Sequence, residues 1–270
     1  MMILTLLLIL SSLALSKELV LVSVYPFYDV VKGVSGDRIT VEVLVPPEAD
    51  YHHYDLSPSD VLRIEKARAI FLSGAPLGGW ELKVERVAGD RAYKLASAGD
   101  PHLWMSPKRM ISVAKRVFDV LSHIDPKGRE EYIKNLRAVI GKLEKLHRLY
   151  ADTLGRCKIK VLPTAHPVFG WLAKDYGLSQ LSIGGGEDHG HGGIFPGELL
   201  HFVKELMRER INFIFSLYGY PSKAEKLLRE EYGVKVYEIN ARIIPSGEGE
   251  DYFSIMEENL RVLGSALRCT

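Results

Sequence analysis

Short apolar runs alternate with amphipathic runs along most of this chain, and this order constrains the fold more than any other feature. The apolar runs have the length and composition of buried strands, and the runs between them have helical periodicity. Alternation of this kind predicts parallel sheets covered by helices on both faces. The predicted strands are residues 19–24, 39–45, 69–73, 159–163, 178–183, 213–216 and 234–239.

The middle of the chain, residues 128–155, interrupts this alternation with a segment that has no strand signal and no proline. Apolar positions there recur at three- and four-residue steps, on one face of a helix about 40 Å long: Ile133, Leu136, Ile140, Leu143 and His147. The sequence therefore predicts an α/β fold with two parallel-sheet domains, one long rigid connector helix and a ligand cleft between the domains. The predicted boundaries are 17–126 for the N-terminal domain, 127–155 for the connector and 156–270 for the C-terminal domain.

The chain begins with an almost continuous apolar run at residues 2–15, followed by its first charged residue, Lys17. The run is shorter than the roughly 20 residues of a membrane-spanning helix. Ala14 and Ser16 form an A-x-S arrangement, so residues 1–16 are predicted to be a secretory signal peptide. A buried first strand and an uncleaved anchor are the alternatives. No cysteine follows the run, which argues against bacterial-type lipid attachment at this point, and we expect an exported protein, either periplasmic or on the outer face of the cytoplasmic membrane.

Charge and cysteine content exclude several classes of protein. The 35 basic and 34 acidic residues nearly cancel, so the chain has no global field for nucleic acid or a membrane surface. Two cysteines, Cys157 and Cys269, are too few for a thiolate zinc cluster or a disulfide scaffold. One disulfide between them and two separate buried thiols remain equal alternatives.

Three histidines lie in predicted loops next to strands or helices. His52 follows the second predicted strand, His102 precedes a helix that begins near Ser106, and His166 follows the first strand of the second half. Ligands of open α/β sheets bind outside the carboxyl ends of the strands, so these side chains can converge in the cleft. Imidazole suits zinc, and a carboxylate or hydroxide is expected to complete a three-histidine site.

Several short strings carry a resemblance to a known family. The chain resembles the substrate-binding proteins of zinc and manganese ABC transporters, the ZnuA-like or TroA-like family, over nearly all of its mature length. The strings are Tyr25-Pro26-Phe27-Tyr28, Val45-Pro46-Pro47, Ser57-Pro58-Ser59-Asp60, Asp100-Pro101-His102-Leu103-Trp104, Phe169-Gly170, Asp251-Tyr252, Met256 and Asn259-Leu260.

The resemblance implies a function and a ligand set. It implies a monomeric, non-enzymatic binding protein that captures Zn²⁺ through His52, His102 and His166 and delivers it to an ABC permease and its ATPase. Manganese-preferring relatives usually have Glu at the third position, so His166 favours zinc over Mn²⁺. The family's usual fourth ligand is an aspartate, and Asn240 stands where it is expected. Asn240, a water molecule or Glu238 could fill that position.

Several alternatives to this function and ligand set remain open. The glycine-rich segment 184–193 contains histidines and acids, and metal capture and a solvated loop are equal alternatives for it. A zinc hydrolase also uses three histidines and water, but no His-Glu-x-x-His string is present. A manganese-binding or adhesin-like member of the family is a further alternative. His53 is expected to point away from His52, and the sequence assigns structural roles to His123, His147 and His201.

Overall fold

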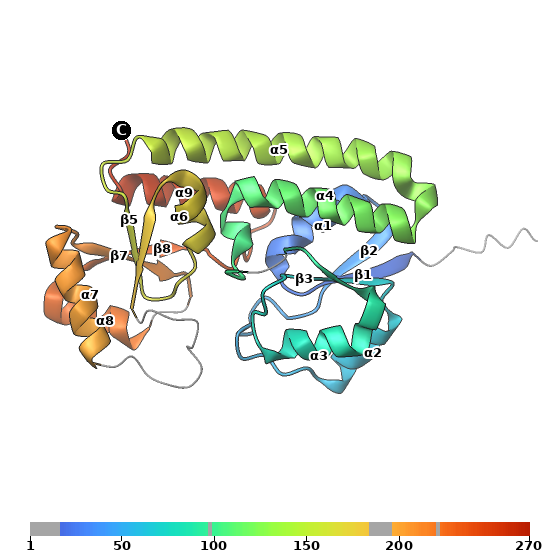
Figure 1. The fold of residues 1–270 in the computed structure, drawn as a ribbon, viewed down its shortest axis with the longest axis horizontal. Helices are drawn as coiled ribbons and strands as arrows, with labels where there is room; N and C mark the ends of the chain where they lie inside the picture. Colours follow the sequence, from blue (N-terminus) through green and yellow to red (C-terminus); the bar gives the residue numbers. More distant parts are fainter. Residues whose placement is uncertain (1–16, 97–98, 184–195, 220–221) are drawn as a thin grey trace, which may run out of the picture.

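The computed structural model describes residues 17–96, 99–183, 196–219 and 222–270. Two predicted features, the signal peptide at 1–16 and the glycine-rich segment 184–193, lie outside these residues. The described strands form two parallel four-stranded sheets, one in each half of the chain, with the orders β2-β1-β3-β4 and β6-β5-β7-β8 (Figure 1). The strands are β1 (Glu18–Val22), β2 (Ile39–Val43), β3 (Ala69–Leu72), β4 (Ala92–Lys94), β5 (Val161–Thr164), β6 (Ser179–Ser182), β7 (Phe213–Leu217) and β8 (Lys235–Ile239).

Helices connect the strands and cover both sheets, which confirms the predicted fold class. They are α1 (Tyr28–Ser35), α2 (Pro58–Lys66), α3 (Gly79–Ala88), α4 (Pro107–Ile124), α5 (Arg129–Gly155), α6 (Gly170–Tyr176), α7 (Pro196–Arg208), α8 (Lys223–Tyr232) and α9 (Tyr252–Ala266), with short 3₁₀ turns at Tyr25–Phe27, Gly89–Arg91, Leu103–Met105 and Pro126–Gly128. Helix α3 and strand β4 are not among the elements predicted from the sequence. Strand β4 has only three residues, none of them buried, so it lacks the apolar run that marks the other strands.

Local signals explain where several of these elements begin. Helix α2 starts after Ser57, whose hydroxyl accepts from the backbone of Asp60 while the Asp60 carboxylate accepts from the backbone of Ser57. This reciprocal capping box satisfies two backbone donors, and Pro58 fits the first helical turn because it has no N–H to satisfy. The central strand β3 is buried throughout and β1 is buried from Val20 to Val22, as expected for parallel strands covered by helices.

The long helix α5 lies along both halves of the molecule (Figure 1). It packs against α1 and α4 in the first half and against α6 and α9 in the second. Its buried face is Tyr132, Leu136, Val139, Leu143, Leu146, Tyr150 and Leu154. Two of the five predicted face positions, Leu136 and Leu143, are fully buried, whereas Ile133, Ile140 and His147 are half-buried. The buried face of α5 is therefore shifted from the predicted one, because tyrosines take part in it. Tyr150, for example, donates from its hydroxyl to the Met256 carbonyl at 2.7 Å.

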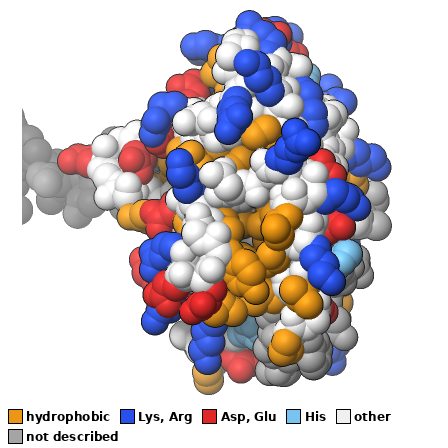
Figure 2. Space-filling model, turned by 90° about the vertical axis from the view of Figure 1, so that its left-hand side faces the viewer, with side chains coloured by type: hydrophobic (Ala, Val, Ile, Leu, Met, Phe, Trp, Pro, Cys, Tyr) orange, Lys and Arg blue, Asp and Glu red, His pale blue; other side chains and the backbone are white. Residues whose placement is uncertain are grey.

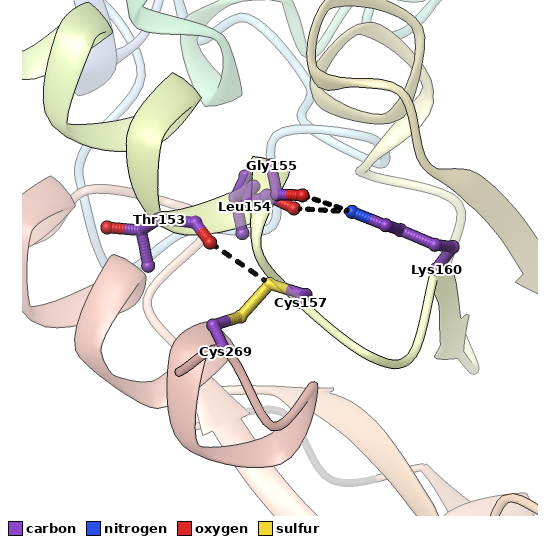
Figure 3. Close-up of a disulfide and its surroundings, with 6 residues drawn as sticks. All are labelled: Thr153, Leu154, Gly155, Cys157, Lys160 and Cys269. Atoms are coloured by element: carbon purple, nitrogen blue, oxygen red, sulfur yellow. Dashed lines mark hydrogen bonds between the residues drawn. A yellow bond between two sulfur atoms is a disulfide. The ribbon is translucent and has the colours of Figure 1, made fainter.

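A disulfide between Cys157 and Cys269 joins the segment after α5 to the C-terminal end (Figure 3). Of the two alternatives left by the sequence, the structure therefore has the bridge. Beside it, Lys160 donates to the carbonyls of Leu154 and Gly155 at 2.8 and 2.9 Å, at the end of α5 where backbone acceptors lack helical partners. The bridge and this lysine together secure the chain where it leaves the long helix.

The face of the molecule at the end formed by α7 and α8 carries side chains of both charges. Figure 2 shows both basic and acidic side chains on that face, with apolar side chains gathered near its middle. Within the described residues, no helix combines the length and the apolar character needed to cross a membrane.

Candidate metal centre

The three predicted histidines meet at one point between the two sheets. His52 lies in the loop after β2, His102 immediately before the turn Leu103–Met105, and His166 in the loop after β5. His166 Nε2 lies 3.2 Å from His52 Nε2, and one ring nitrogen from each residue lies within 4.8 Å of the other two. Two nitrogens bonded to a tetrahedral zinc at about 2.0–2.1 Å would be about 3.3 Å apart, so the His52–His166 spacing already suits this ion.

The other ring nitrogens of two histidines are held by protein acceptors. His52 Nδ1 lies 2.8 Å from the Leu77 carbonyl, and His102 Nδ1 lies 2.7 Å from Asp100 Oδ1. A carbonyl or carboxylate can only accept, so these contacts assign the proton to Nδ1 and leave the lone pair on Nε2. Contacts of this kind orient a metal-binding imidazole and increase its basicity.

The Nε2 atom of His102 is the clearest sign of a missing partner. His102 is 4% exposed, and in the part of the chain that the structure describes its Nε2 has no hydrogen-bond partner. A buried polar atom without a partner carries a free-energy penalty of about 1–3 kcal/mol. A cation bound at this nitrogen would remove the penalty.

The charge state of the cluster also suits a cation. Burial, followed by the neighbouring His102, lowers the pKa of His52 from its ordinary 6.5 to about 4. His52 is therefore neutral near pH 7, which is the form that binds metals. Within the described residues, no carboxylate or thiolate belongs to the group formed by the three histidines.

Asn240, the predicted fourth ligand, uses its side chain in a local turn after β8. Its Nδ2 donates to the Ile244 carbonyl at 2.7 Å, and its Oδ1 accepts from the Ile244 backbone N–H at 3.1 Å. The oxygen that would coordinate the metal thus already has a donor. Glu238, the acid named as an alternative, is exposed on β8. Coordination by Asn240 stays a prediction that these contacts do not favour.

The residues that support His102 were not predicted from the sequence to do so. Asp100 accepts from the His102 backbone at 2.8 Å as well as from its ring, and Trp171 of α6 donates from Nε1 to the Asp100 carbonyl at 2.6 Å. A Cβ atom at Gly170 would lie 2.5 Å from Asp100 Oδ2, so this glycine leaves room for the carboxylate. The available signal was the Asp two positions before a ligand-type His, a spacing that allows the aspartate to accept from the backbone two residues on.

The remaining histidines with described surroundings lie outside the cluster. His53 is exposed and contacts Asp50 Oδ2 at 3.0 Å, as expected for the neighbour that points away. His147 Nδ1 lies 3.1 Å from the Tyr176 hydroxyl, and His123 and His201 are exposed on helices. The structure thus brings together the three histidines that were predicted as ligands and leaves these four apart.

Comparison with known proteins gives one family. The model of the family described as zinc-uptake complex component A, periplasmic, matches residues 20–266. The zinc-binding lipoprotein AdcA of Streptococcus pneumoniae strain R6 is 30% identical over 88% of this chain, and the chain spans only 54% of that relative's length. The high-affinity zinc uptake system protein ZnuA of Bacillus subtilis strain 168 is 27% identical over 92% of this chain and 87% of its own length.

Solved structures agree with the sequence relatives. The Zn(II)-bound ZnuA-like domain of Streptococcus pneumoniae AdcA superposes with a TM-score of 0.79 at 29% identity, covering 93% of this chain and 99% of that domain. The match therefore includes both sheets and the long helix between them. On the evidence of the family model and this shared architecture, the chain belongs to the family of the periplasmic zinc-uptake complex component A.

Proposed function

We propose that this chain is an exported solute-binding protein that captures one Zn²⁺ ion between its two halves. The ion would be bound by the Nε2 atoms of His52, His102 and His166. The observation that carries the proposal is the convergence of three imidazoles from separate loops on one point, with the buried His102 nitrogen lacking a partner among the described residues. The zinc-binding names of the relatives support it.

Zinc fits this donor set better than manganese does. Imidazole nitrogens suit zinc, whereas Mn²⁺ prefers carboxylate, carbonyl and water oxygens. A water or hydroxide in the fourth position would complete a tetrahedral site and, as hydroxide, would offset part of the charge of the ion.

The second part of the proposal is that the chain binds zinc and catalyses no reaction. Proteins of this family are binding components of uptake systems rather than enzymes. We propose that the chain acts as a monomer outside the cytoplasm and passes zinc to an ABC permease driven by its ATPase. A three-histidine hydrolase would also need a general base beside the bound water. Among the described residues, the Asp100 carboxylate beside the cluster is already engaged by the ring and backbone of His102.

A competition titration with a chromophoric zinc chelator, together with metal analysis, tests this function. We expect one zinc per chain and a preference for zinc over manganese. His52→Ala, His102→Ala and His166→Ala should each weaken zinc by more than about 100-fold, because outer-sphere partners of a metal alone contribute about 10–100-fold. His123→Ala and His201→Ala are the matched controls on exposed helical positions. Equal losses in both sets, or tighter binding of manganese, would contradict the proposal.

A further inference from the structure

A buried arginine of the second half, Arg242, contacts the loop that carries His52 in the first half. Arg242 follows β8 and is only 7% exposed. Its Nη2 donates to the backbone carbonyls of Pro47 and Ala49. A guanidinium is planar and permanently charged, with its donors in a fixed fork, so two acceptors on one turn of backbone hold it in a defined orientation.

The same guanidinium lies over the aromatic ring next to the metal ligands. Arg242 Cζ is 5.3 Å from the centroid of the Tyr51 ring, within the range of a cation–π contact. The Tyr51 ring is buried, with its centroid 4.6 Å from that of His52 and 6.5 Å from that of His102. Arg242 therefore fixes both the backbone before His52 and the ring that packs against two of the three histidines.

The turn that carries Arg242 is itself held in place. The Asn240 side chain bonds both the N–H and the carbonyl of Ile244, which closes the turn around Arg242. Trp104, two residues after His102, donates from Nε1 to the Ala241 carbonyl at 2.7 Å. Ile243 has a positive φ of 54°, a conformation that a β-branched residue adopts only where its surroundings impose it. Movement of the His52 loop away from the second half must therefore break the Arg242 contacts.

We propose that Arg242 is a positioning residue that latches the His52 loop onto the second half and so slows the release of zinc. This inference rests on the proposed function. Electrostatics alone would predict the opposite effect, because the fixed positive charge of Arg242 near a bound dication should speed its release. Loss of the guanidinium should speed zinc release if the latch dominates and slow it if charge repulsion dominates, so this change distinguishes the two effects.

The test is the rate of zinc dissociation from the full chain into excess chelator, followed by stopped-flow absorbance. We expect Arg242→Gln to release zinc at least about tenfold faster than the unaltered chain. Arg242→Lys should be intermediate, because an ammonium keeps the charge and can donate to a carbonyl but lacks the planar fork.

Arg91→Gln is the matched control. Arg91 donates from Nη1 to the carbonyls of Ile64, Glu65 and Ala67 at 2.8, 3.0 and 2.6 Å, so it performs the same chemistry within the first half alone. Its loss should lower the melting temperature and leave zinc release unchanged.

Three results would overturn the latch: slower release from Arg242→Gln, an unchanged rate, or equal acceleration in Arg91→Gln. If Arg242→Gln does not fold, the Arg242→Lys rate decides, and a value equal to that of the unaltered chain overturns the proposal. Failure of the unaltered chain to bind zinc would overturn the proposed function, whereas normal binding with an unaffected Arg242→Gln rate would overturn the latch alone.

Discussion

At the scale of single residues, the cluster depends on which nitrogen of each imidazole carries the proton. Leu77 and Asp100 accept at Nδ1 of His52 and His102 and thereby free Nε2 for a metal. The histidine positions could be proposed from the sequence because His52 and His166 follow predicted strands and His102 lies in a recognisable string before a helix. The contact of His52 with the Leu77 carbonyl could not be predicted, because a backbone acceptor 25 residues from His52 leaves no side-chain signal in the sequence. Asn240 was assigned by its place in a family string; its amide closes a turn in the structure, and coordination by it stays a prediction.

The carboxylate of Asp100 gives the first prediction at this scale. Asp100→Asn keeps an acceptor but removes the negative charge behind His102, so zinc affinity should fall by about 10–100-fold. Asp125→Asn is the control: its carboxylate accepts from Arg38 and Tyr132, outside the cluster, and its loss should lower stability only. Equilibrium competition with a chelator measures both variants, and an Asp100→Asn affinity equal to that of the unaltered chain would refute the role of Asp100.

The lowered pKa of His52 predicts how the stability of the metal-free protein depends on pH. Between pH 6.5 and about 4 the unfolded chain takes up a proton on His52 that the folded chain does not, because the folded pKa is about 4. The folded state therefore loses stability across this window, by about 3 kcal/mol at most, and has no further loss from this group below it. Urea unfolding of the unaltered chain and of His52→Gln at several pH values isolates the contribution. Identical slopes of unfolding free energy against pH would contradict it.

At the scale of helices and strands, the sequence predicts well what depends on local pattern and poorly what depends on packing partners. Helix α5 covers nearly all of the predicted segment 128–155, and α2 begins directly after its capping residue Ser57. Strand β4 is too short to carry a pattern, and the face of α5 is displaced because Tyr132 and Tyr150 are buried. The Arg242 contacts join segments nearly 200 positions apart, which periodicity cannot connect.

Gly141 provides a prediction for the long helix. It lies exposed in the interior of α5, and a Cβ atom there would meet nothing within 4 Å. Gly141→Ala should therefore stabilise the protein by about 0.5–1 kcal/mol, because glycine has a larger backbone entropy to lose in a helix. Gly33→Ala is the opposed control, since its Cβ would lie 2.9 Å from a methyl group of Val139 on α5. Chemical denaturation measures both, and a destabilised Gly141→Ala variant would show that α5 is not continuous there.

At the scale of the whole molecule, α5 packs against helices of both halves, and α9 makes further contacts between the halves. Tyr252 at the start of α9 donates from its hydroxyl to the Trp104 carbonyl and from its backbone to Asp29. A helix packed against helices of both halves cannot bend like a flexible linker of glycine and serine. We therefore expect the two halves, between which the proposed zinc site lies, to move little relative to one another.

This rigidity predicts the response to zinc in solution. Small-angle scattering should give nearly the same radius of gyration before and after zinc is added, because changes should be confined to the loops that carry the ligands. His52→Ala with zinc serves as the control for effects of the ion on the solvent. A large decrease in radius that occurs only in the unaltered chain would indicate wide domain closure and would contradict the role of α5.

In the proposed site, zinc is held by three imidazoles supplied by both halves of the molecule. X-ray absorption at the zinc edge of the purified, zinc-loaded protein tests it most directly, since imidazole rings give distinctive multiple scattering. We expect three histidine nitrogens at about 2.0–2.1 Å from zinc, and two in the His166→Ala protein. A spectrum with fewer than three imidazoles in the unaltered chain, or one unaffected by His166→Ala, would contradict it.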